Sequence, residues 1–132
     1  MKDTNAQSGN ERKFDLDERL IDFSVMVINV MEKLPNTKAA NHLGGQAIRS
    51  GTSPCLNYGE ATEAESRNDF IHKMGICRKE LGETKNALKI LIRKPYKEIL
   101  PEGEIALKEC SELIRIFSKS IETAKRNRDS KG

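Results

Sequence analysis

Apolar residues recur at alternating steps of three and four along most of the sequence, and this spacing restricts the fold more than any other feature. A segment over 15–34 has such a row at Leu16, Leu20, Phe23, Val27, Val30 and Leu34. A second, over 66–93, has Phe70, Met74, Cys77, Leu81, Leu88 and Leu91, with Thr84 in the gap. A third, over 102–126, has Ala106, Cys110, Leu113, Phe117, Ile121 and Ala124. This period puts each row on one face of an α-helix, so it predicts three amphipathic helices.

A fourth helix is predicted from Thr37 to between Glu60 and Ala64, and its composition is less usual. Its packing face consists mostly of small residues, namely Ala40, Leu43, Gly44, Ala47, Gly51, Pro54, Tyr58 and Ala61. Glycine weakens a helix by about 1 kcal/mol and proline removes a backbone donor, so we expect a kink or a short break near Gly51–Pro54. Small residues also predict that a neighbouring helix approaches closely.

The connections between these four helices are short and contain prolines. Together they predict an all-α fold, an antiparallel up-down four-helix bundle over residues 14–127. Residues 1–13 are polar and without periodicity, so we expect a disordered tail. Residues 128–132 are expected to be a basic, frayed tail.

The composition excludes several classes of protein. With 132 residues the chain fits one domain, and 23 basic against 20 acidic residues leave a charge of +3, which neither requires nor excludes nucleic acid. No apolar run reaches membrane-spanning length and no signal peptide precedes residue 20, so we expect a cytoplasmic protein that does not enter a membrane. Cys55, Cys77 and Cys110 are odd in number and lack a C-x-x-C pair, which favours buried free thiols and predicts no metal or cofactor.

Several short motifs between residues 49 and 84 resemble one known family. They are RSGTS (49–53), Asn57, Glu60-Ala61, AES (64–66), DFIHK (69–73), KE (79–80) and ET (83–84). They are similar to the bacterial four-helix-bundle family named for proteins encoded in intervening sequences of large-subunit ribosomal RNA genes. The resemblance covers residues 15–125 and implies an up-down bundle that assembles into ring-like homo-oligomers, namely pentamers. The similar accessory protein of diversity-generating retroelements binds its reverse transcriptase and nucleic acid through a basic surface. The resemblance therefore also implies such a protein partner, and RNA or DNA.

Polar residues form a stripe beside the small-residue face of the second helix. Within roughly a third of the helix circumference lie Gln46, Arg49, Ser50, Ser53, Asn57 and Glu60. In a structural interpretation, carboxylates and amides satisfy Arg49, which then fixes helix register or subunit contacts. The alternative is an anion or phosphate site.

Basic residues cluster along one edge of the third helix. The nucleic-acid-binding candidates are Arg78, Lys85, Lys89 and Arg93, continued by Lys125, Arg126 and Arg128. A solvated face or ion pairs between subunits would explain them, and so would a footprint on a phosphate backbone. Aromatic residues make up only 5% of the chain and none interleaves these positions. Any binding should therefore lack base stacking, be independent of sequence and weaken with salt.

One short motif points to catalysis instead. Arg67 and His72 match the R-x4-H pattern of HEPN ribonucleases, in which such residues serve acid-base catalysis and phosphate stabilisation. Five positions apart on one helix, the two side chains point in different directions, and a cap-region arginine with a surface histidine is the alternative. Asp69-x-x-His72 is a single imperfect copy of the motif that a di-iron bundle needs twice, which argues against a metal centre.

The sequence therefore favours a non-enzymatic, self-assembling helical bundle that acts as a scaffold or adaptor and binds nucleic acid weakly through a basic face. Two alternatives stay open. One is a metal-independent ribonuclease that uses Arg67 and His72. The other is a purely protein-binding module, which predicts a co-purifying partner and no interaction with nucleic acid.

Overall fold

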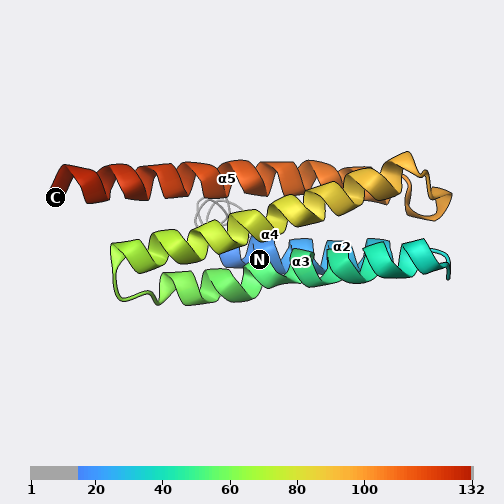
Figure 1. Cartoon of the computed structure of the whole chain (residues 1–132), viewed down its shortest axis with the longest axis horizontal. Coiled ribbons are helices and arrows are strands. Elements are labelled where there is room, and N and C mark those ends of the chain that lie inside the picture. Colours follow the sequence, from blue (N-terminus) through green and yellow to red (C-terminus); the bar gives the residue numbers. More distant parts are fainter. Residues whose placement is uncertain (1–14, 132) are drawn as a thin grey trace, which may run out of the picture.

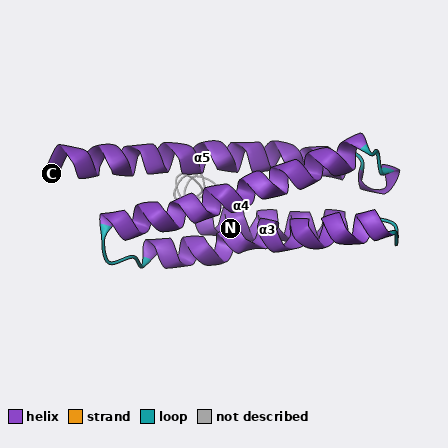
Figure 2. Cartoon of the chain, in the orientation of Figure 1, coloured by secondary structure: helices purple, strands orange, loops and turns teal. Residues whose placement is uncertain are grey.

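The structure, a computed structural model, describes residues 15–131 and consists of four long helices. These are α2 (Leu16–Met31), α3 (Lys38–Thr62), α4 (Arg67–Arg93) and α5 (Glu102–Lys131), with a short 3₁₀ turn, η1 (Lys97–Ile99), before α5. Successive helices run in opposite directions and lie side by side (Figure 1). Residues 15–131 contain helices and loops but no strand (Figure 2). The predicted antiparallel four-helix bundle is confirmed, whereas the predicted tail over 1–13 lies outside the described residues.

Side chains at the start of three helices cap free backbone donors. Asp15 Oδ1 accepts from the Glu18 amide at 3.3 Å, and Thr37 Oγ1 accepts from the Ala40 amide at 3.2 Å. Ser66 Oγ accepts from the Asp69 amide at 3.0 Å. Each such cap stabilises a helix by about 1 kcal/mol, which is why the helices begin where they do.

The course of α3 past Pro54 differs from its prediction. The short break expected near Gly51–Pro54 is absent, because α3 continues through Pro54 while its neighbours hold the backbone. Ser24 Oγ approaches the Gly51 carbonyl at 3.4 Å and Cys77 Sγ approaches the Pro54 carbonyl at 3.6 Å. The kink stays a prediction.

The C-terminal helix also differs from its prediction. Whereas a helix end near Arg126 and a tail over 128–132 were expected, α5 continues to Lys131. Arg128 Nη1 donates to Asn68 Oδ1 at 3.2 Å, which ties the last turns of α5 to the start of α4. The α2 helix is shorter than expected and ends at Met31 rather than Leu34.

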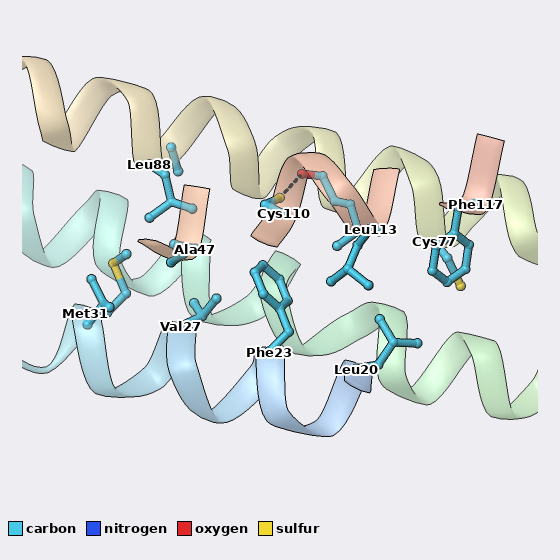
Figure 3. Close-up of a cluster of buried hydrophobic side chains, with 14 of the residues drawn as sticks. Leu20, Phe23, Val27, Met31, Ala47, Cys77, Leu88, Cys110, Leu113 and Phe117 are labelled. Carbon is cyan, nitrogen blue, oxygen red and sulfur yellow. Dashed lines mark hydrogen bonds between the residues drawn. The ribbon is translucent and has the colours of Figure 1, made fainter. Parts of the chain in front are cut away.

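The core lies along the bundle axis and is built from the predicted apolar rows (Figure 3). Phe23 of α2 and Phe117 of α5 are its largest fully buried side chains. Tyr58 of α3 meets Phe117 edge to face, with ring centroids 5.9 Å apart. Ile99 of η1 is also buried, a position that the helical periodicity does not predict. The small residues of α3 allow the predicted close approach, since a Cβ added at Gly51 would lie 3.0 Å from Val27 Cγ1.

Two of the three cysteines are buried free thiols, as predicted. Burial raises the pKa of Cys77 and of Cys110 to about 12, so both are protonated at neutral pH. Their sulfurs approach backbone carbonyls, that of Cys110 lying 3.2 Å from the Leu81 oxygen. Cys55 is only half-buried, which corrects the expectation for that residue.

Candidate nucleic-acid interface

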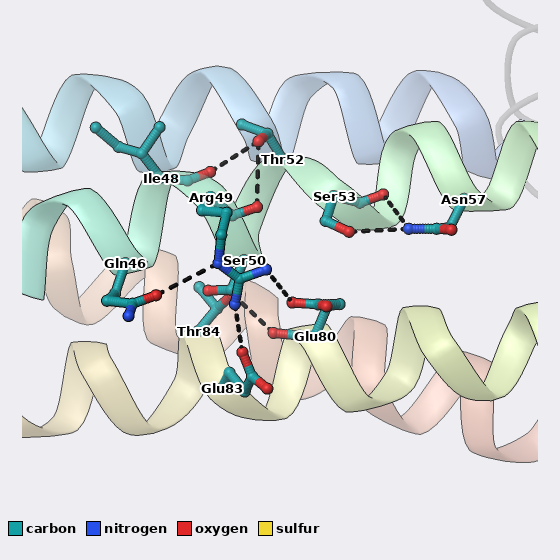
Figure 4. A network of polar contacts seen from close by, with 10 residues as sticks. All are labelled: Gln46, Ile48, Arg49, Ser50, Thr52, Ser53, Asn57, Glu80, Glu83 and Thr84. Atoms are coloured by element: carbon teal, nitrogen blue, oxygen red, sulfur yellow. Dashed lines mark hydrogen bonds and ion pairs between the residues drawn. The ribbon is translucent and has the colours of Figure 1, made fainter.

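The polar stripe of α3 faces α4, and Arg49 connects the two helices (Figure 4). Its Nη2 lies 2.6 Å from Glu83 Oε1, and its Nη1 lies 3.1 Å from Glu80 Oε1. Its Nε donates to Gln46 Oε1 at 3.3 Å. One guanidinium therefore meets two carboxylates, which leaves a net negative charge around Arg49. This geometry favours the structural interpretation, since a phosphate placed here would be repelled.

The ion pair between Arg49 and Glu80 neutralises a carboxylate oxygen, Glu80 Oε1, that water cannot reach. Glu80 Oε1 is inaccessible to solvent and accepts no well-aligned hydrogen bond from the described residues. The Glu80 side chain is only 13% exposed, and Arg49 Nη1 is the cation beside it. Without Arg49, a largely buried carboxylate would be left without a partner.

Two other members of the stripe also join α3 to α4. Ser50 Oγ and Thr84 Oγ1 lie 2.7 Å apart in the core, and Glu60 Oε1 pairs with Lys73 Nζ at 3.0 Å. Ser53 and Asn57 instead bond to each other within α3, the Asn57 amide donating to Ser53 Oγ at 2.9 Å. The stripe is thus chiefly a helix-to-helix seam.

Basic side chains line a hollow of about 470 Å³ between α4 and α5, which we call the α4–α5 groove. Its lining residues are Arg78, Arg115, Ser118, Lys119, Ile121, Glu122 and Lys125. Four of these are cationic and only Glu122 is acidic. Arg115 pairs with Glu112 at 3.2 Å, whereas Arg78, Lys119 and Lys125 form no ion pair with any residue of 15–131. The groove therefore presents uncompensated positive charge.

Arg78 and Lys125 of this groove were among the candidates named from the sequence, whereas Arg115 and Lys119 were not. Arg115 and Lys119 lie one turn apart on α5, and this spacing is the sequence feature that could have indicated a pair of basic side chains on one side of the helix. It carries little weight alone, because only the packing of α5 against α4 brings Arg115 and Lys119 beside Arg78.

The other candidate basic residues lie elsewhere. Lys89 and Arg93 line a separate hollow of about 380 Å³ with Asn86 and Ile90. Lys85 is partly buried near Cys110, and its charge opposes the rise in the Cys110 pKa. Arg126 and Arg128 pair within α5, with Glu122 at 3.8 Å and with Asp129 at 3.0 Å. Of the seven candidates, only Arg78 and Lys125 line the α4–α5 groove.

Arg67 and His72 are not brought together within the chain. Arg67 lines a hollow of about 810 Å³ where the α3–α4 loop meets the end of α5. His72 is exposed on α4 and is absent from that lining. The ribonuclease hypothesis therefore lacks an assembled pair of catalytic groups in one subunit and stays a hypothesis.

Residues 15–131 lack two further kinds of site, a metal centre and a membrane-spanning helix. Within that range no three His, Cys, Asp or Glu side chains are grouped so that they could hold a metal ion. None of the helices there combines the length and apolar character needed to cross a membrane.

The protein is therefore an all-helical antiparallel bundle that carries the cationic α4–α5 groove between its last two helices. The profile of the 23S rRNA-intervening sequence protein family matches residues 12–120, and the chain belongs to that family. A similar solved structure is a protein of unknown function from the S23 ribosomal protein family of Bacteroides thetaiotaomicron VPI-5482. It shares 32% identity with a TM-score of 0.72, over 80% of this chain and 96% of that one. No curated protein matches the sequence.

Proposed function

We propose that the protein is a non-enzymatic, self-assembling scaffold of the cytoplasm that binds RNA or DNA weakly and without sequence preference. The phosphate backbone would lie along the α4–α5 groove. The groove's lining carries the proposal, because it sets Arg78, Lys119 and Lys125 together without internal ion pairs. Free thiols at Cys77 and Cys110 suit a reducing compartment.

Cations in such a groove act by displacing the counterions that surround a nucleic acid. Each phosphate neutralised releases condensed ions, so affinity falls steeply as salt rises. No aromatic side chain is among the groove's lining residues, so base stacking would contribute nothing there.

Assembly strengthens this weak interaction. One chain carries a net charge of only +3, and a homo-oligomer multiplies both that charge and the number of grooves. Five subunits is the number that the family resemblance implies. As an adaptor, the oligomer would also hold a protein partner, for which the resemblance suggests a reverse transcriptase.

The test compares two double variants with the same change in charge. Arg78→Glu/Lys119→Glu alters the groove, whereas Lys38→Glu/Lys97→Glu alters exposed lysines outside it. Binding to a short labelled RNA and to a DNA duplex is measured by fluorescence anisotropy over a salt series. The groove variant should bind at least about tenfold more weakly, and its salt slope should fall by about two, one per lost phosphate contact. The control should retain wild-type affinity within about twofold, since exposed charges outside a contact matter little. Equal losses in both variants would contradict a role for the groove.

A further inference from the structure

The outward side of α2 exposes two apolar side chains among acidic ones. Ile21 and Val25 are 43% and 50% exposed, while Leu20, Phe23 and Val27 fill the core from the opposite side of the same helix. Neighbouring exposed apolar side chains with a charged rim are one mark of a protein-binding surface. The exposed acidic residues Asp17, Glu18 and Asp22 flank Ile21 and Val25 and form no ion pair within residues 15–131. We call these five residues the α2 outer face.

The outward side of α4 has the opposite character. Gly75, Lys79, Gly82, Ile90 and Arg93 follow one another at helical spacing, and we call them the α4 outer face. A Cβ added at Gly75 or at Gly82 would meet nothing within 4 Å, so nothing inside the subunit requires glycine there. Glycine is a poor helix former, and two of them in mid-helix suit a surface to which another chain comes close.

The two faces are complementary in charge. Lys79 and Arg93 form no ion pair with the described residues, and Ile90 is 52% exposed. The α4 outer face therefore offers positive charge, one apolar side chain and two glycines with no side chain above the backbone. The α2 outer face offers negative charge and two apolar side chains that could pack on that backbone. Opposite charges around an apolar centre are the pattern of a specific protein interface.

We propose that the α2 outer face of one subunit docks on the α4 outer face of a second copy of this chain. The inference rests on the self-assembly in the proposed function and specifies the surfaces that carry it. The α2 and α4 helices occupy diagonal positions in the bundle, so the two faces point to opposite sides. Unlike surfaces on opposite sides give head-to-tail contacts, which close into a ring or continue as a filament.

This contact divides the basic residues between two tasks. Lys79 and Arg93 belong to the contact between subunits, whereas the α4–α5 groove lies on the α5 side of α4 and stays open to a phosphate backbone. Nucleic acid itself is a poor partner for the α2 outer face, because Asp17, Glu18 and Asp22 would repel it.

The experiment uses two variants that each disable one face. Ile21→Lys/Val25→Lys places positive charge on the α2 outer face, and Gly75→Gln/Gly82→Gln adds bulky side chains to the α4 outer face. Glutamine favours helix and the added atoms have open space, so the glycine variant should melt at or above the wild-type temperature. Size-exclusion chromatography with light scattering should show a wild-type oligomer and a monomer for each variant alone. An equimolar mixture of the two variants should form a 1:1 dimer, because each variant keeps the face that the other lacks.

Lys38→Glu, at the exposed start of α3 and outside both outer faces and the α4–α5 groove, serves as the control and should retain the wild-type mass. If Gly75→Gln/Gly82→Gln stays oligomeric while Ile21→Lys/Val25→Lys is monomeric, the α2 outer face must dock on a different surface, and the proposal is overturned. Two variants that both keep the wild-type mass would overturn it as well, and so would a mixture that stays monomeric. A monomeric wild-type chain would instead contradict the self-assembly on which the proposal rests.

Discussion

Two hydroxyl groups, Ser50 Oγ and Thr84 Oγ1, form the only pair of buried polar residues at the α3–α4 seam among the described residues. Thr84 also donates to the Glu80 carbonyl at 3.0 Å, so Ser50 depends on Thr84 more than Thr84 depends on Ser50. A buried hydroxyl without a partner is costly, whereas a pair that is removed together leaves nothing unsatisfied.

This asymmetry predicts unequal effects of the two single substitutions. Thr84→Val should lower the free energy of unfolding by about 1–3 kcal/mol, because Ser50 loses its partner. Ser50→Ala should lower it by about 0.5–1.5 kcal/mol, since the Glu80 carbonyl still satisfies Thr84. In the double variant the loss should be smaller than the sum of the two. Urea denaturation followed by circular dichroism measures all three, and a strictly additive double variant would show that the hydroxyls act independently.

At the same scale, the sequence predicted that Arg49 needs carboxylates but not which ones. Helical spacing places residues on a face of one helix and says nothing about the register between two helices. Glu80 and Glu83 became its partners only through the packing of α4 against α3.

Among the elements, the contact between α2 and α3 is set by Gly51. Its Cα faces Val27, whose two methyl groups would lie 3.0 and 3.1 Å from an added Cβ. Valine is branched at Cβ and has little rotamer freedom in a helix, so it cannot move aside easily. The small-residue face of α3 therefore sets the distance between these helices.

Gly51→Ala should destabilise the fold by about 1–3 kcal/mol, the usual result of overpacking. Gly45→Ala, in the same helix but with nothing within 4 Å of the added Cβ, should instead stabilise it by about 0.5–1 kcal/mol. Thermal unfolding of the two variants checks the difference in sign. If both substitutions raised the melting temperature, Gly51 would not be a close contact.

The elements were largely predictable, and their boundaries less so. Apolar periodicity predicted three helices because core burial decides helix faces, and the small-residue face indicated the fourth. Local helix propensity suggested a break near Pro54, which packing on α2 and α4 prevents. Periodicity ended too early at Arg126, because the Arg128 bond to Asn68 extends α5 by contact with a distant segment.

For the whole molecule, the distribution of charge matters more than its sum. The α2 outer face is acidic and apolar, while the α4–α5 groove is cationic. The sequence indicated Arg78 and Lys125 as basic candidates but not the groove in which the structure places them. Arg115 and Lys119 could not be assigned to it, because they meet Arg78 only after two helices distant in sequence have packed.

The most direct test of a self-assembling scaffold with a cationic groove is its solution mass by light scattering. The chain is measured alone, then with a short RNA and with a DNA duplex, at low and at physiological salt. We expect a closed oligomer that gains the mass of nucleic acid at low salt and loses it as salt rises. A monomer at every condition, or an oligomer that ignores nucleic acid even at low salt, would contradict the proposed function.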